Sequence, residues 1–219
     1  EGTVNKTALS LLILLACGLW TYNMSTEDAS GYIMPGFIGG LIEAVVTIFK
    51  KEWSATTVPL YAALEGIALG GISKVYADLY YEGIVTQSIM LTVGIFFTLL
   101  LAYKSKLIKP TENFKLGVVA ATGGIAIFYL VSMLFNVFGG SPSPLLNSSN
   151  GSWMSIGFSL FVVVIASLNL VMDFDFIEEG AANGAPKYME WYGAFGLLVT
   201  LIWLYLEILR LLAKISSRR

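Results

Sequence analysis

The sequence predicts an all-α protein, a polytopic bundle of about seven transmembrane helices. Of its 219 residues, 56% are hydrophobic and 13% are charged, and the mean hydropathy is +0.75. A water-soluble domain of this length could not cover so much apolar surface with polar side chains. Apolar runs recur from end to end without a long polar block, so we expect a single integral membrane domain over residues 1–219.

Seven runs have the length and composition of membrane segments. A helix needs roughly 17 to 25 mostly apolar residues to cross a hydrocarbon core of about 30 Å. The first run is slightly shorter than this, and the others reach it. The predicted segments are residues 7–22, 32–49, 58–77, 84–103, 116–138, 153–172 and 188–209.

The connections after the first three runs contain residues that are unfavourable in lipid. The first run has no small-residue cleavage motif after it, so we expect a retained helix. Two lysines follow the second run, and the connections after the first and third are acidic or uncharged. Glycines four apart, at 36 and 40 and at 66 and 70, predict close helix packing by the second and third runs.

The last four apolar runs are also followed by charged or helix-breaking residues that mark the ends of membrane segments. Four lysines follow the fourth run. The fifth is followed by GGSPSPLLNSSNGS, residues 139–152, where Pro142 and Pro144 prevent continuation of the helix. The acidic stretch 173–179 follows the sixth run, and a basic C-terminus follows the seventh.

Lysines indicate the orientation, because basic connections face the cytoplasm. They are Lys50 and Lys51 after the second run and Lys104, Lys106, Lys109 and Lys115 after the fourth. We therefore expect a cytoplasmic N-terminus, with the stretch 173–179 on the same side. Seven full crossings place the C-terminus outside, although it carries Arg210, Lys214, Arg218 and Arg219. Either the last run is re-entrant or it crosses despite this bias, and we favour the crossing.

The composition excludes several kinds of chemistry. The chain has no histidine and one cysteine, Cys17, so it cannot build a Cys/His zinc site, a histidine-based nucleophile or an internal disulfide. We expect no cofactor and no enzyme activity. The net charge of -2 and the scattered basic residues indicate no nucleic-acid partner.

Five acidic residues are candidates for an ion or proton route. Glu43, Glu65 and Glu207 lie inside predicted segments, and Asp173 and Asp175 end the sixth. A charge near the bilayer centre costs about 2.5 to 3.5 kcal/mol on insertion scales, so such acids face the protein interior or water. Two residues apart on a helix is a rotation of roughly 200°, so we expect Asp173, and not Asp175, to face the bundle.

Two interpretations of these acids remain open. Neighbouring carboxylates in a low-dielectric site cannot all stay ionised, which would let them sense pH without histidine. Calcium usually takes about six to eight oxygen ligands, so any contact with Asp173 and Glu207 would be transient and no metal would be stably bound. Alternatively, each acid is neutral or paired and only ties helices together; Glu207 and Arg210, three apart, could pair.

Four stretches resemble the bacterial branch of the Bax inhibitor-1 family. They are LYLEILRLL at 204–212, LNLVMDFDFIEEG at 168–180, YAALEGIALGGIS at 61–73 and GAPKYMEWYGAFGLL at 184–198. The resemblance implies a seven-helix bundle with a central last helix, in the bacterial inner membrane. It also implies a pH-sensitive calcium leak gated by a carboxyl dyad, which falls here on Asp173 and Glu207, with Glu43 as the acid of the second helix.

This sequence departs from the family pattern at two points. The acid of the seventh helix is Glu207 where the pattern usually has aspartate, and a basic partner in the second helix has no clear counterpart. The resemblance also permits a different function, a non-conducting membrane scaffold or regulatory subunit bound to a protease or a respiratory assembly. The expected partners are therefore membrane lipids, calcium ions or protons, and in this second case a membrane protein.

Overall fold

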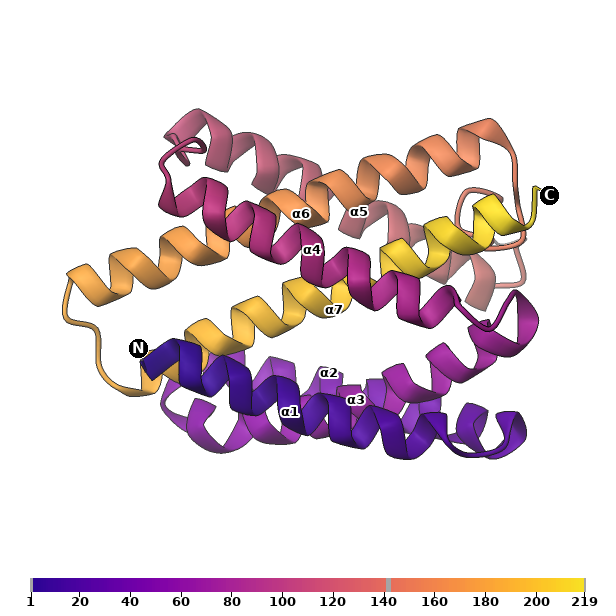
Figure 1. Ribbon diagram of the computed structural model, residues 1–219, viewed down its shortest axis with the longest axis horizontal. Helices are drawn as coiled ribbons and strands as arrows, with labels where there is room; N and C mark the ends of the chain where they lie inside the picture. The colour runs from indigo at the N-terminus through magenta and orange to yellow at the C-terminus, as the bar shows by residue number, and fades with distance from the viewer. Residues whose placement is uncertain (1, 141–142, 219) are drawn as a thin grey trace. The chain divides into compact units, whose positions relative to one another are not determined.

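The computed structural model describes residues 2–140 and 143–218, and all of its regular structure is helical. Seven helices are long and apolar enough to cross a membrane, which confirms the predicted polytopic bundle (Figure 1). They are α1 Gly2–Tyr22, α2 Thr26–Phe49, α3 Ser54–Leu79, α4 Ile84–Lys104, α5 Glu112–Val137, α6 Trp153–Ala182 and α7 Tyr188–Ser216. A single 3-10 turn, η1 at Lys51–Trp53, precedes α3.

Helix α6 is longer than its predicted segment. The acidic stretch 173–179, which follows the predicted segment, continues the helix because no proline or glycine interrupts the chain before Gly180. The helix ends where Gly184 adopts a left-handed backbone conformation with φ of 64°. The amide of Ala185 then donates to the carbonyl oxygen of Gly180 at 3.0 Å, which closes the helix end.

The chain divides into two compact units, which we describe separately. Unit 1 contains residues 1–85 and 175–199, and unit 2 contains residues 86–174 and 200–219, so α6 and α7 contribute to both. Unit 1 has twelve acidic and five basic residues, a net charge of -7, whereas unit 2 has three acidic and eight basic residues, a net charge of +5. The small net charge of the whole chain is therefore the sum of a strongly negative unit and a strongly positive unit.

In unit 1, helix α3 packs against both α1 and α2. A methyl group on Gly70 would overlap the carbonyl oxygen of Gly18 in α1. On the other side of α3, a methyl group on Gly36 of α2 would lie 2.8 Å from the carbonyl oxygen of Leu64. The expectation that these glycines mark close helix contacts is confirmed.

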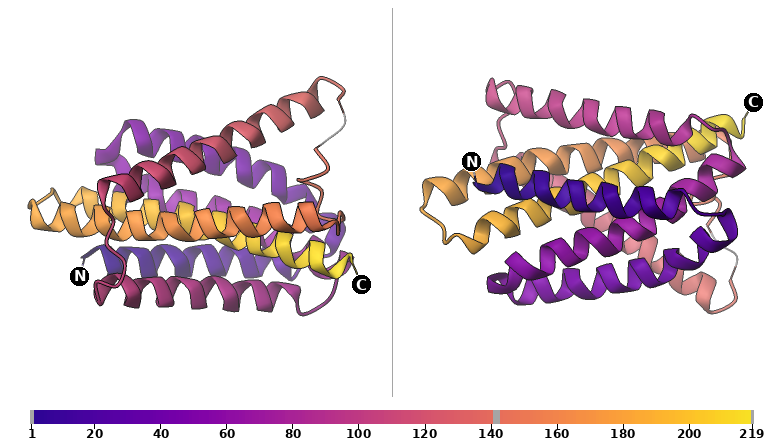
Figure 2. Two further views of the ribbon diagram at one scale, coloured as in Figure 1. Left: turned by 90° about the horizontal axis from the view of Figure 1, so that it is seen from above. Right: turned by 60° about the horizontal axis from the view of Figure 1, so that its bottom comes forward.

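In unit 2, the first part of α6 and the last part of α7 run antiparallel and side by side (Figure 2). Their core with α5 is an apolar cluster, with Trp203 of α7 packed against it. The cluster consists of Ile125, Val162 and Ile165. More than half of the most apolar stretch of α7 is buried, as in α3, whereas α1, α2, α4 and α5 are mostly exposed.

Candidate functional site

A row of polar side chains follows the facing surfaces of α5, α6 and α7 in unit 2, and we call it the polar row. Its members on α6 are Ser155, Ser159, Asn169 and Asp173, those on α7 are Thr200, Glu207, Arg210 and Lys214, and those on α5 are Thr122 and Tyr129. From Ser155 to Asp173 the helix rises about 27 Å, close to the thickness of a bilayer core.

Asp173 lies at one end of the polar row. The buried hydroxyl of Thr200 donates a hydrogen bond to its carboxylate, so Asp173 faces α7 as the sequence predicts. Its Oδ2 atom is excluded from solvent and has no hydrogen-bond partner. A buried carboxylate oxygen without a partner is unfavourable when charged, so binding a proton or a cation there would be favourable.

Glu207 lies two turns further along α7 and is 2% exposed. Arg210 Nη1 donates to Glu207 Oε1 at 2.8 Å and to Oε2 at 3.0 Å, which confirms the predicted i, i+3 pair. The Tyr129 hydroxyl of α5 donates to Glu207 Oε1 at 2.7 Å and accepts from Arg210 Nη1 at 3.0 Å. The charge of Glu207 is therefore compensated, and its carboxylate joins α7 to α5.

Lys214 ends the polar row and is completely buried. Its ammonium donates to the carbonyl oxygen of Leu145, to that of Ser155 at 3.2 Å, and to Ser159 Oγ at 2.7 Å. The three acceptors match the three N–H donors of a charged ammonium. Lys214 is therefore not arranged as a general base, although Ser159 lies beside it. This Ser159–Lys214 contact is geometrically a nucleophile–base pair, which we did not expect from the sequence, but it is enclosed by the protein.

The middle of the polar row is interrupted by apolar side chains. Asn169 Nδ2 donates to Thr122 Oγ1 at 2.8 Å, which ties α6 to α5. Between Asn169 and Ser159 the same face of α6 carries Val162 and Ile165 of the apolar cluster. The polar groups are therefore divided by an apolar segment, a feature that in channels opposes the passage of water and ions.

The two members of the predicted carboxyl dyad lie on this row without touching each other. Thr200, which binds Asp173, and Glu207 are seven residues apart on one face of α7, a rise of about 10 Å. Among the described residues, no hydrogen bond joins the two carboxylates; Asp173 bonds Thr200, and Glu207 bonds Tyr129 and Arg210.

The other three predicted acids fall in unit 1. Glu65 of α3 is 6% exposed, lies against Gly40 of α2, and has an Oε2 atom without a hydrogen-bond partner. Glu43 of α2 and Asp175 of α6 are half-buried. Among the described residues, each unit thus contains one carboxylate with a buried, unpartnered oxygen, Asp173 in unit 2 and Glu65 in unit 1.

The basic residues at the end of α7 make internal contacts. Arg210 pairs with Glu207, Lys214 is buried, and the guanidinium of Arg218 lies 3.5 Å from the centroid of the Trp153 ring. Arg219 lies outside the described residues, as do Ser141 and Pro142 of the predicted loop. At least three of the four positive charges therefore serve contacts within unit 2, which weakens them as signals of membrane orientation.

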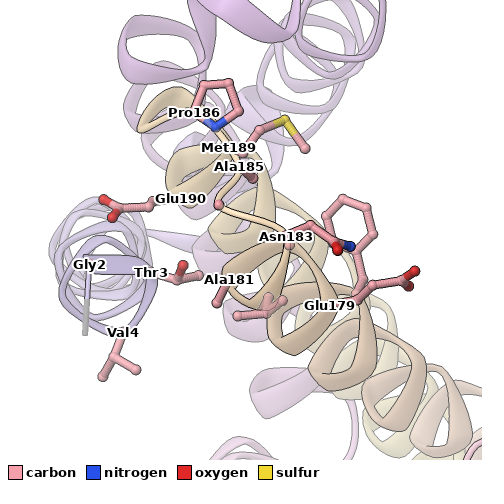
Figure 3. Close-up of a pocket in the computed structure, with 14 residues that line it drawn as sticks. Gly2, Thr3, Val4, Glu179, Ala181, Asn183, Ala185, Pro186, Met189 and Glu190 are labelled. Carbon is pink, nitrogen blue, oxygen red and sulfur yellow. The ribbon is translucent and has the colours of Figure 1, made fainter.

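A pocket of about 620 Å³ lies in unit 1, between the first turn of α1, the end of α6 and the start of α7 (Figure 3). Glu190 extends toward α1, where Lys6 forms an ion pair with it, and Glu179 lies on another wall. None of the five predicted acids lines this pocket. It is therefore separate from the polar row.

Tyr129 and Lys214 are members of the polar row that the sequence did not indicate as site residues. Tyr129 lies in the middle of α5, away from the helix ends where tyrosines anchor at headgroup depth. Lys214 follows Glu207 by seven residues, which places both on one helix face. These two positions in the sequence could have indicated Tyr129 and Lys214 as site residues. Their hydrogen-bond partners on other helices are known only from the fold.

Seven apolar helices with a buried polar row define a polytopic helical membrane protein. The sequence matches the family described as Bax inhibitor 1 like over residues 1–217. The chain therefore belongs to the Bax inhibitor 1 like family, as its four sequence stretches predict. A comparison with curated proteins gives no match, so the family assignment rests on this alignment.

Proposed function

We propose that this protein is a proton-gated cation leak, with calcium as the transported ion, and that Asp173 and Glu207 are two carboxyl stations of its route. The observation that carries the proposal is Asp173, whose Oδ2 atom is buried without a partner at one end of a row about as long as the bilayer core is thick. Intramembrane acids of this kind commonly mark ion and proton pathways.

Protonation is the gating event in this proposal. A proton on Asp173 removes a charge from a site where one oxygen has no partner, and it changes the hydrogen bond with Thr200 that joins α6 to α7. Movement of α7 would then relieve the apolar interruption at Val162 and Ile165. Carboxylate oxygens, water and backbone carbonyls would contact calcium transiently during passage.

The remaining parts of the proposal concern unit 1 and the setting of the protein. Glu43, Glu65 and Asp175 are the further candidate carboxyl stations within unit 1, where Glu65 is the strongest candidate because it is buried with an unpartnered oxygen. We infer a cytoplasmic N-terminus from the lysines after the second and fourth helices, and a bacterial inner membrane from the family resemblance.

Calcium flux into proteoliposomes containing the purified protein, measured across roughly pH 6 to 8, tests this function. We expect a flux that rises as the pH falls, that loses its pH dependence in Asp173→Asn, and that decreases in Glu207→Gln. Glu112→Gln is the matched control, because Glu112 is 93% exposed in the same unit.

An unchanged flux and an unchanged pH response in both variants would overturn the assignment of these residues. No flux above that of empty liposomes at any pH would overturn the leak itself and favour a non-conducting scaffold. Co-purification of a stoichiometric membrane protein from native membranes would then support the second function.

A further inference from the structure

The connection between α5 and α6 is attached to the end of α7 by two basic residues, both within unit 2. We call residues 145–153 of this connection the cap segment. The buried ammonium of Lys214 donates to the carbonyl oxygen of Leu145 at its start, and Arg218 lies over the ring of Trp153 at its end. The cap segment is thus held at both ends.

The cap segment lies against the chain that directly follows α7. A methyl group on Gly151 would lie 3.1 Å from the backbone nitrogen and Cα of Arg218, so a larger residue would require a shift of a few tenths of an ångström. The guanidinium of Arg218 is 3.5 Å from the centroid of the Trp153 ring, a cation–π contact.

Hydrogen bonds also connect the cap segment within itself and to the residues next to it. Asn150 Nδ2 donates to the carbonyl oxygen of Pro144 at 2.9 Å, and its Oδ1 accepts from the amide of Ser152 at 3.0 Å. The hydroxyl of Ser155 in α6 donates to the carbonyl oxygen of Leu145 at 3.4 Å. These bonds fix the path of the cap segment between α5 and α6.

Within the part of the chain that the structure describes, the charge of Lys214 is bound by uncharged acceptors only. A buried cation is unfavourable unless it is paired, and no carboxylate among the described residues forms an ion pair with Lys214. In unit 2, Glu207 is bonded to Arg210, Asp173 lies at the other end of the polar row, and Glu112 pairs with Lys115. The positive charge is therefore not neutralised where it is buried, which points to a function for the charge beyond the hydrogen bonds that it makes.

We infer that the cap segment, held by Lys214 and Arg218, closes one end of the polar row and that the charge of Lys214 excludes cations there. This inference rests on the proposed leak and adds the residues that keep it closed. A fixed positive charge at the end of a narrow route repels calcium, and the excess of eight basic over three acidic residues in unit 2 acts in the same direction. Conduction requires displacement of the cap segment.

Lys214→Met is the direct test, because methionine keeps much of the length of the side chain and removes its charge. We expect calcium flux at pH 7 to rise at least about tenfold over the unsubstituted protein, because a like charge within a few ångströms of the ion is lost. Lys115→Met is the matched control: this lysine lies on the surface of the same unit, and its substitution should leave flux unchanged.

Arg218→Gln is the second variant, since an exposed residue at the helix end is tolerated even if the loss of Lys214 impairs folding. It removes the contact with Trp153, and we expect a smaller rise in flux. The rate of chymotrypsin cleavage within residues 145–153 gives an independent measure of cap release, and it should increase in both variants.

The outcomes separate this inference from the proposed function. A pH-dependent flux in the unsubstituted protein that neither variant increases would overturn the inference and leave the leak intact. Faster cleavage in both variants without flux in any protein would support the attachment of the cap segment by Lys214 and Arg218 but overturn the leak. Unchanged cleavage in both variants would overturn this attachment, whatever the flux.

Discussion

Arg210 is the residue that allows Glu207 to remain buried as a carboxylate. The Glu207 side chain is 2% exposed and takes two hydrogen bonds from Arg210, whereas the Arg210 side chain is 25% exposed. Removing the arginine leaves a buried charge without its counter-charge. We expect Arg210→Met to lower the free energy of unfolding by about 2 kcal/mol, below the range for a fully buried pair because Arg210 is partly solvated.

Chemical denaturation of the protein in detergent, followed by far-ultraviolet circular dichroism, measures this effect. The double variant Glu207→Met with Arg210→Met is the control, because it removes both charges and should recover part of the lost stability. Equal stability of the single and double variants would show that the pairing does not hold Glu207 in place.

At the scale of helices, the glycines of α3 set how closely α1 approaches. A methyl group on Gly70 overlaps the backbone carbonyl of Gly18, and backbone cannot move aside as a flexible side chain can. We expect Gly70→Ala to destabilise the protein by about 2 kcal/mol, since the two helices must separate. The shift in thermal denaturation temperature in detergent measures it.

Gly94→Ala is the matched control for this prediction. Gly94 lies in α4, and a methyl group there has no neighbour within 4 Å. Alanine favours helix more than glycine, so stability should be unchanged or slightly raised. A loss of stability as large as that of Gly70→Ala would mean that the effect arises from glycine itself and not from the contact between α1 and α3.

At the scale of the whole molecule, we expect seven full crossings, which would place the two ends of the chain on opposite sides of the membrane. Helix α7 has 29 residues, about 43 Å of helix, which is more than enough for a full crossing. With Cys17 replaced by serine, a cysteine at Ser217 should react with a membrane-impermeant maleimide in intact cells. A cysteine at Ser105, in the α4–α5 connection, should react only after lysis.

Labelling of Ser217 and Ser105 from the same side would instead show that α7 is re-entrant. The basic residues of α7 do not argue for that alternative, because Arg210, Lys214 and Arg218 have partners within unit 2. Their charges are used in contacts and are not free to act as a signal for retention in the cytoplasm.

The membrane class, the seven helices, the glycine contacts and the pairing of Glu207 with Arg210 were all evident from the amino-acid sequence. Each depends on hydropathy over one helix or on spacing along one helix, which are local properties of the chain. Helix α6 extends through the acidic stretch beyond the predicted membrane segment, because acidic residues are compatible with a helix once it leaves the apolar core.

Only the tertiary structure decided which side chains meet across helices. In the fold, Asp173 is hydrogen-bonded to Thr200, and Tyr129 of α5 is hydrogen-bonded to Glu207. Lys214 is buried and donates hydrogen bonds to Leu145 and Ser159. The fold also divides five predicted acids between two units of opposite net charge. These contacts join residues up to 78 positions apart, and they depend on the packing of whole helices, which spacing within one helix does not predict.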